Sequence, residues 1–230
     1  MIPLRDNIPS TRRPYVGYTI IGLNVLVFLL EVSTGPHLQE VINTLGFIPG
    51  RFLGALGHGE LTLAVIPMFT SMFMHAGWLH LIGNMWTLHI FGDNVEDVLG
   101  PGLFLLFYLV CGVAALVPHV VFDAGSTIPL VGASGAIAGV MGAYFSLFPG
   151  ARVLTLVPIF IIFTVIEVPA YIFLGLWFVL QFFQGAFSIM GPAARGGVAW
   201  WAHVGGFLAG VVLIRLFAPG RAGNPFRRRY

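Results

Sequence analysis

The chain has 230 residues, of which 57% are hydrophobic and only 9% are charged. Soluble domains carry about 25% charged residues, so this composition excludes an ordinary soluble domain and indicates a protein that crosses a membrane several times. The small positive charge comes from arginines gathered near the two ends, a pattern typical of membrane topology signals and not of nucleic-acid binding.

Six apolar segments approach the roughly 20 residues that cross a bilayer. The sequence predicts spanning helices at about 15–32, 66–91, 102–122, 132–148, 168–187 and 198–217. The first segment follows charged residues as a signal peptide does, but it lacks a small-residue cleavage site and is expected to be retained. The expected fold is therefore all-α: a polytopic bundle of six transmembrane helices over residues 15–218, after an N-terminal segment 1–14 and before a basic tail 219–230.

Two connections stand out between these segments. The longest, at about 33–65, mixes apolar and polar residues, which favours a membrane-associated loop with short helices. The stretch 152–167 is apolar and β-branched, and Pro158 interrupts it. It fits either a short interfacial hairpin or an extension of the fifth helix.

Six spans place both ends of the chain on one side of the membrane. Arginines lie before the first span, after the last span and at Arg152 after the fourth, and the positive-inside rule makes that side cytoplasmic. We expect a bacterial plasma (inner) membrane with both termini cytoplasmic. The fourth and sixth spans then have Ser134 and His203 at similar depth, in the outer half of the bilayer.

Ser134 and His203 could form a nucleophile and its base. A serine hydroxyl becomes reactive when a neighbouring base takes its proton, and polar residues inside spans usually have a function. Small residues four apart let helices approach closely in lipid. The sequence predicts such contact faces on the fourth and sixth spans, at Gly135 and Gly139 and at Ala202, Gly206 and Gly210.

The oxyanion of an acyl-transfer intermediate also needs donors. The Ser134 amide belongs to the first turn of a helix, where amides have no partner within the helix. His80 and Asn84 are four residues apart and share a helical face. His75 would be rotated from His80 by about 140° on an ideal helix, so it is predicted to support the site without joining it.

These residues give the chain its resemblance to the rhomboid intramembrane serine proteases. The matching segments are His75-Ala-Gly-Trp-Leu-His80-Leu-Ile-Gly-Asn84, Gly132-Ala-Ser134-Gly135, and Ala202-His203 with Gly206 and Gly210. The resemblance implies a six-helix core with Ser134 as nucleophile and His203 as base. His80, Asn84 and the Ser134 amide would form the oxyanion hole.

The chain departs from the family pattern at two places. Many rhomboids carry Trp-Arg in the first loop, which is missing here, and some have a tyrosine that stacks on the histidine where this chain has Ala138. Another aromatic side chain, or packing, would then orient His203. Trp177 and Phe178 in the fifth span are either lipid-facing bulk or a movable gate.

The expected function is an intramembrane serine endopeptidase that cleaves single-span membrane proteins within or near the outer end of their transmembrane helix. The alternative is a non-catalytic rhomboid-like protein that binds membrane helices, but such relatives typically lack the serine or the histidine. No organic cofactor is implied. A zinc site made of His75, His80 and His203 is disfavoured, because no carboxylate accompanies them. The sequence indicates neither the natural substrate nor the oligomeric state.

Overall fold

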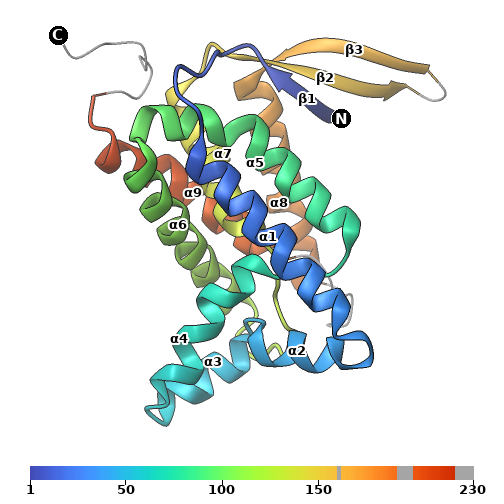
Figure 1. Cartoon of the computed structure of the whole chain (residues 1–230), viewed down its shortest axis with the longest axis vertical. Coiled ribbons are helices and arrows are strands. Elements are labelled where there is room, and N and C mark those ends of the chain that lie inside the picture. Colours follow the sequence, from blue (N-terminus) through green and yellow to red (C-terminus); the bar gives the residue numbers. More distant parts are fainter. Residues whose placement is uncertain (160–161, 191–198, 221–230) are drawn as a thin grey trace.

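The computed structural model describes residues 1–159, 162–190 and 199–220, and it shows a helical bundle with a small sheet at one end (Figure 1). The long helices are α1 (Tyr15–Ser33), α5 (Trp78–Leu99), α6 (Pro101–Phe122), α7 (Ser134–Leu147), α8 (Ala170–Met190) and α9 (Trp200–Phe217). Shorter elements link α1 to α5, namely η1 (Gly35–His37), α2 (Leu38–Leu45), α3 (Pro49–Gly57), α4 (Leu61–Thr70) and η2 (Ser71–Phe73). The sheet contains β1 (Ile2–Asp6), β2 (Arg152–Ile159) and β3 (Ile162–Pro169). The expected basic tail at 219–230 lies mostly outside the described residues.

Within the described residues, four helices are long and apolar enough to cross a membrane: α1, α6, α8 and α9. A fifth candidate is a bent pair, in which Leu61–Phe73 meets Trp78–Leu99 at 82°. The expected continuous span at 66–91 was therefore wrong in its first part. Pro67 lies inside α4 and weakens its hydrogen-bond ladder, and the backbone is extended at Met74 and Gly77 before α5 begins.

Helix α7 has only 14 residues, which make about 21 Å at 1.5 Å per residue. This is shorter than a hydrocarbon core of about 30 Å. Most of its side chains are buried, and it lies in the middle of the bundle (Figure 1). Because α7 leads into the sheet at its C-terminal end, its first residue stops short of the opposite face of the bundle.

Glycines allow α7 and α9 to pack backbone against backbone. A Cβ added at Gly206 would overlap the carbonyl oxygen of Gly135, and one added at Gly210 would overlap that of Gly139. The helix faces predicted from the spacing of small residues are confirmed. Their contact fixes the position of the start of α7 relative to the start of α9.

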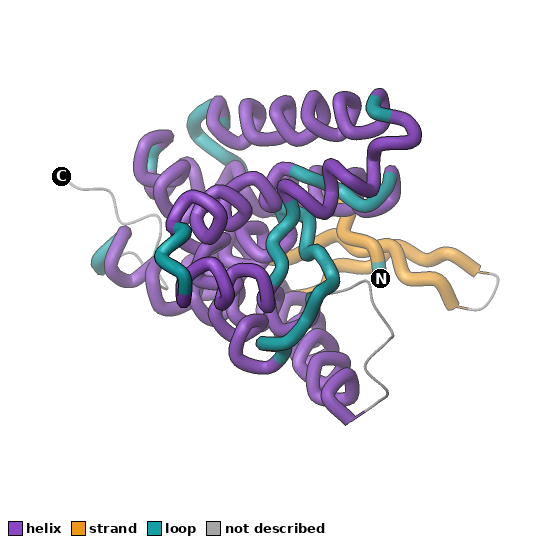
Figure 2. Tube along the Cα trace, turned by 90° about the horizontal axis from the view of Figure 1, so that it is seen from below, coloured by secondary structure: helices purple, strands orange, loops and turns teal. Residues whose placement is uncertain are grey.

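The stretch after α7 is a hairpin, which decides between the two expected alternatives. Strands β2 and β3 pair antiparallel from Arg152↔Pro169 to Ile159↔Ile162. Strand β1, in the N-terminal segment, adds to β2 and gives the order β1-β2-β3. The sheet extends to one side of the bundle in two views (Figures 1 and 2), so an otherwise helical protein carries one β element that the sequence did not indicate at its N-terminus.

Side chains of α5 and α7 hold the N-terminal segment in place. The Glu96 carboxylate accepts hydrogen bonds from the amides of Val16 (3.0 Å) and Gly17 (2.8 Å), and a carboxylate at a helix N-terminus is favourable. Asp6 at the end of β1 accepts hydrogen bonds from the Tyr144 hydroxyl and from Asn94 Nδ2. The sheet is thus tied to α5 and α7.

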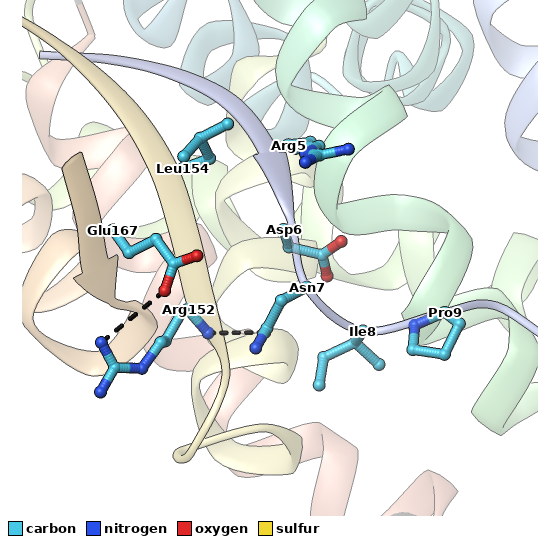
Figure 3. A pocket seen from close by; sticks show the side chains of 8 residues that line it. All are labelled: Arg5, Asp6, Asn7, Ile8, Pro9, Arg152, Leu154 and Glu167. Atoms are coloured by element: carbon cyan, nitrogen blue, oxygen red, sulfur yellow. Dashed lines mark hydrogen bonds and ion pairs between the residues drawn. The ribbon is translucent and has the colours of Figure 1, made fainter. Parts of the chain in front are cut away.

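A cavity of about 430 Å³ lies beside β1 and β2 (Figure 3). Arg152 donates its amide hydrogen to Asn7 Oδ1 at 2.7 Å and pairs with Glu167 at 3.8 Å. The remaining lining residues are Arg5, Asp6, Ile8, Pro9 and Leu154. The lining includes no serine, cysteine or histidine, so this cavity does not hold the serine and histidine predicted as nucleophile and base.

Candidate active site

Ser134 and His203 meet at the start of two helices. Ser134 is the first residue of α7, and His203 is the fourth residue of α9. The distance from Ser134 Oγ to His203 Nε2 is 2.8 Å, within the range of a normal hydrogen bond. The hydroxyl can therefore donate to an unprotonated Nε2, as a nucleophile does toward its base.

The loop before Ser134 lies directly against His80. Gly132 has a φ of +134°, and a Cβ at this position would lie 2.7 Å from His80 Cε1 and 2.8 Å from His80 Nε2. The missing side chain lets the imidazole pack on the backbone just before the nucleophile. The Gly132 amide is also fixed, since it donates to the Ser71 carbonyl at 2.8 Å.

His75 lies in the extended break before α5, so the helical rotation between His75 and His80 used above was wrong. Its buried ring contacts the His80 ring edge-on at 5.1 Å. Asn84 Nδ2 lies 3.0 Å from His75 Nε2, and the His75 amide donates to the Glu31 carboxylate at 3.1 Å. The structure thus brings His75, His80 and Asn84 together, with His80 against Gly132 and His75 holding the Asn84 amide.

Two side chains of α8 contact the base. His203 Nδ1 lies 2.6 Å from Gln181 Oε1, and the ring centroids of Trp177 and His203 are 5.8 Å apart. Gln181 was not singled out from the sequence, although a glutamine inside an apolar span was a signal that could have pointed to it. Phe178 packs on Phe207 of α9 at 5.0 Å, so Trp177 and Phe178 both contact α9.

A second cavity, of about 20 Å³, adjoins Ser134. Its lining residues are Ser71, Met72, Gly112, Ala115, Leu116, Leu130, Gly132, Ser134, Gly135, Ala136 and Ala202. A cavity of this size holds about one water molecule. This cavity is too small to hold a peptide in this conformation, although Ser134 and His203 are both partly exposed.

Comparison with known proteins identifies the family of this chain. Residues 62–220 match the family described as the Rhomboid domain. Rhomboid protease GluP of Bacillus subtilis is 34% identical over 57% of this chain and 24% of its own length. Rhomboid protein 1, mitochondrial, of Saccharomyces cerevisiae is 28% identical over 85% of this chain and 51% of its own length. Presenilin-associated rhomboid-like protein, mitochondrial, of Homo sapiens is 32% identical over 64% and 36%.

These relatives are longer than the chain, which spans about half of the yeast protein and less of the other two. One of these relatives comes from a bacterium, and the names of the other two describe them as mitochondrial. The comparisons therefore support a multi-pass membrane protein, and they do not support the bacterial plasma membrane expected from the sequence.

Proposed function

The chain belongs to the rhomboid family, and from that premise we propose that it is an intramembrane serine endopeptidase. The observation that carries this proposal is the 2.8 Å distance between Ser134 Oγ and His203 Nε2 at the start of two tightly packed helices. A non-catalytic relative has no need of a serine hydroxyl held on an imidazole nitrogen.

The geometry suggests the following reaction. Ser134 Oγ attacks the carbonyl carbon of the scissile peptide bond while His203 Nε2 takes its proton. The oxyanion that forms would accept hydrogen bonds from the Ser134 amide, His80 and Asn84. His203 then gives the proton to the leaving amine. In the second half, His203 takes a proton from water, whose oxygen attacks the acyl carbon. The ester bond to Ser134 then breaks, His203 returns the proton to Ser134 Oγ, and the carboxylic acid product leaves. None of these steps requires a metal or an organic cofactor.

We propose single-span membrane proteins as substrates, cleaved near the outer end of their transmembrane helix. Ser134 lies within the bundle, at the end of the short α7 that faces away from the sheet, and little space adjoins it. In a substrate helix the carbonyl groups are shielded by hydrogen bonds, so the segment must unwind before Ser134 can reach a peptide bond. The sheet, the start of α1 and the end of α9 lie at one end of the bundle (Figure 1), which supports placing the N-terminal segment and the end of α9 on the same side of the membrane.

The test uses purified protein in detergent with a panel of single-span substrates. Ser134→Ala and His203→Ala should abolish cleavage, because a nucleophile and its base have no substitute, and a fluorophosphonate probe should label wild type but not Ser134→Ala. Unchanged thermal unfolding would show that the variants fold. Cleavage by folded Ser134→Ala at the wild-type rate would overturn the proposal.

A further inference from the structure

We propose that Gln181 of α8 is the positioning residue of the base, completing a Ser134–His203–Gln181 hydrogen-bonded chain. This inference rests on the proposed function, because it assigns a role within the same site. It adds α8 to the helices α5, α7 and α9 that carry the other residues of the proposed site.

The hydrogen-bond chain is continuous. Gln181 Oε1 lies 2.6 Å from His203 Nδ1, and His203 Nε2 lies 2.8 Å from Ser134 Oγ. The Gln181 side chain is buried, with 8% of the residue exposed. A buried amide in a membrane segment is costly unless it is hydrogen-bonded, and its carbonyl oxygen finds its partner on the base.

This arrangement selects the tautomer that catalysis needs. An amide oxygen accepts hydrogen bonds and cannot donate them. With Gln181 Oε1 facing Nδ1, the hydrogen of a neutral imidazole resides on Nδ1, and Nε2 presents its lone pair to the serine hydroxyl. When His203 takes the serine proton, the same oxygen also stabilises the imidazolium. The opposite tautomer would leave Nε2 protonated and unable to act as the base.

Helix α8 supplies this orientation because α7 does not. Ala138, one turn after the nucleophile on α7, is fully buried and has no group that could stack on a ring. Trp177 and Gln181 are four residues apart on α8 and share a face. Trp177 lies beside the His203 ring, and Gln181 accepts a hydrogen bond from it. Together they fix both the plane and the rotation of the imidazole.

A consequence concerns the movement that admits a substrate. If α8 moved away from α9 at the level of Gln181, the base would lose its orientation. Helix α8 must therefore be seated on α9 when the proton is transferred, and a gate built from α8 has to close before chemistry.

The test compares substitutions at Gln181 with the same change at Gln184, which is an exposed glutamine on the same helix. Gln181→Met keeps the size and removes the acceptor, so kcat should fall up to about a hundredfold with little change in KM.

Gln181→Glu keeps an acceptor and adds a negative charge, which favours the imidazolium. It should retain most of the wild-type kcat at alkaline pH, and the acidic limb of its pH–rate profile should move to higher pH. Gln184→Met should behave as wild type.

The outcomes separate this inference from the proposed function. If wild type cleaves, Ser134→Ala does not, and folded Gln181→Met keeps the wild-type kcat, the positioning role is overturned while the protease remains. A loss in Gln181→Met with no rescue and no shift of the pH profile in Gln181→Glu would indicate a purely structural side chain and would also overturn it. Absence of cleavage and probe labelling in wild type would instead reject the proposed function.

Discussion

At the scale of single residues, the candidate site depends on backbone positions as much as on side chains. Gly132 has no Cβ, and this lets the His80 ring lie against the loop that leads to Ser134. The Gly132 amide is also tied to Ser71. A φ of +134° is disfavoured for any residue with a side chain, so the identity of this residue decides where His80 can be.

Replacing Gly132 with alanine should inactivate the protein by moving His80. The added Cβ would lie 2.7 Å from the ring, and the backbone strain alone costs about 1–3 kcal/mol. We expect loss of cleavage and of fluorophosphonate labelling, measured as initial rates on folded protein. Gly83→Ala on α5 is the control, since nothing lies within 4 Å of its added Cβ. Full activity in Gly132→Ala would show that His80 need not hold its position.

Some residues of the candidate site could be predicted from the sequence, and others could not. The meeting of Ser134 and His203 was predicted from their types and spacing, and the structure brings the two together. The roles of His80 and Asn84 stay predictions. Gln181 could not be assigned its role, because the hydrogen bond joins helices whose relative rotation no local pattern specifies. The place of His75 was misjudged because the start of α5 was set too early.

At the scale of secondary-structure elements, the short α7 and its contact with α9 place the nucleophile. Long apolar runs predicted α1, α6, α8 and α9 within a few residues, because every face that meets lipid must be apolar. The bend between α4 and α5 could not be seen in the same way, since residues on both sides of it are apolar. The hairpin remained one of two alternatives, because its strands are as apolar as the helix that follows.

Substituting Gly206 with alanine should push α7 and α9 apart. Its Cβ would overlap the Gly135 carbonyl oxygen, and such overpacking typically costs about 1–3 kcal/mol. Because Gly135 follows Ser134 and Gly206 lies three residues after His203, the same shift should lengthen the distance between the two reacting atoms. We expect a lower thermal unfolding midpoint in detergent together with slower phosphonate labelling. Gly22→Ala on α1, where nothing lies within 4 Å, should change neither. An unchanged midpoint in Gly206→Ala would contradict the backbone contact.

At the scale of the whole molecule, the sheet links the first residues of the chain to the helix that carries the nucleophile. Pairing of β1 with β2 joins residues about 150 positions apart, from Ile2↔Leu156 to Asp6↔Val153. A five-residue strand with a proline gives no local signal of such a partner, so this part of the fold could not be predicted from the sequence. The Asp6 side chain completes the link through Tyr144 of α7 and Asn94 of α5.

This link should depend on pH. Burial, with a further contribution from the Asp93 carboxylate, raises the pKa of Asp6 from 3.8 to about 6, although the Tyr144 hydrogen bond acts in the opposite direction. Arg5 and Arg152 line the same cavity as Asp6, but they do not offset the effect of burial. Between its unfolded and folded pKa values the folded state binds more protons than the unfolded state. The stability that protonated Asp6 contributes is therefore complete below a pH of about 4 and is lost as the pH rises through about 6.

Asp6→Asn keeps an acceptor for Tyr144 and cannot ionise. Its thermal unfolding midpoint should match that of wild type below a pH of about 4, where Asp6 is protonated in both the folded and the unfolded state, and should exceed it near pH 8, where folded wild type carries a half-buried charge facing Asp93. Asp123→Asn, at an exposed position, should track wild type at both pH values. A difference between Asp6→Asn and wild type that is the same at the two pH values would show that ionisation of Asp6 does not weaken the docking of β1. The expected pH-dependent difference would mean that acidification strengthens the attachment of the N-terminal strand to α5 and α7, at the far end of the helix that begins with Ser134.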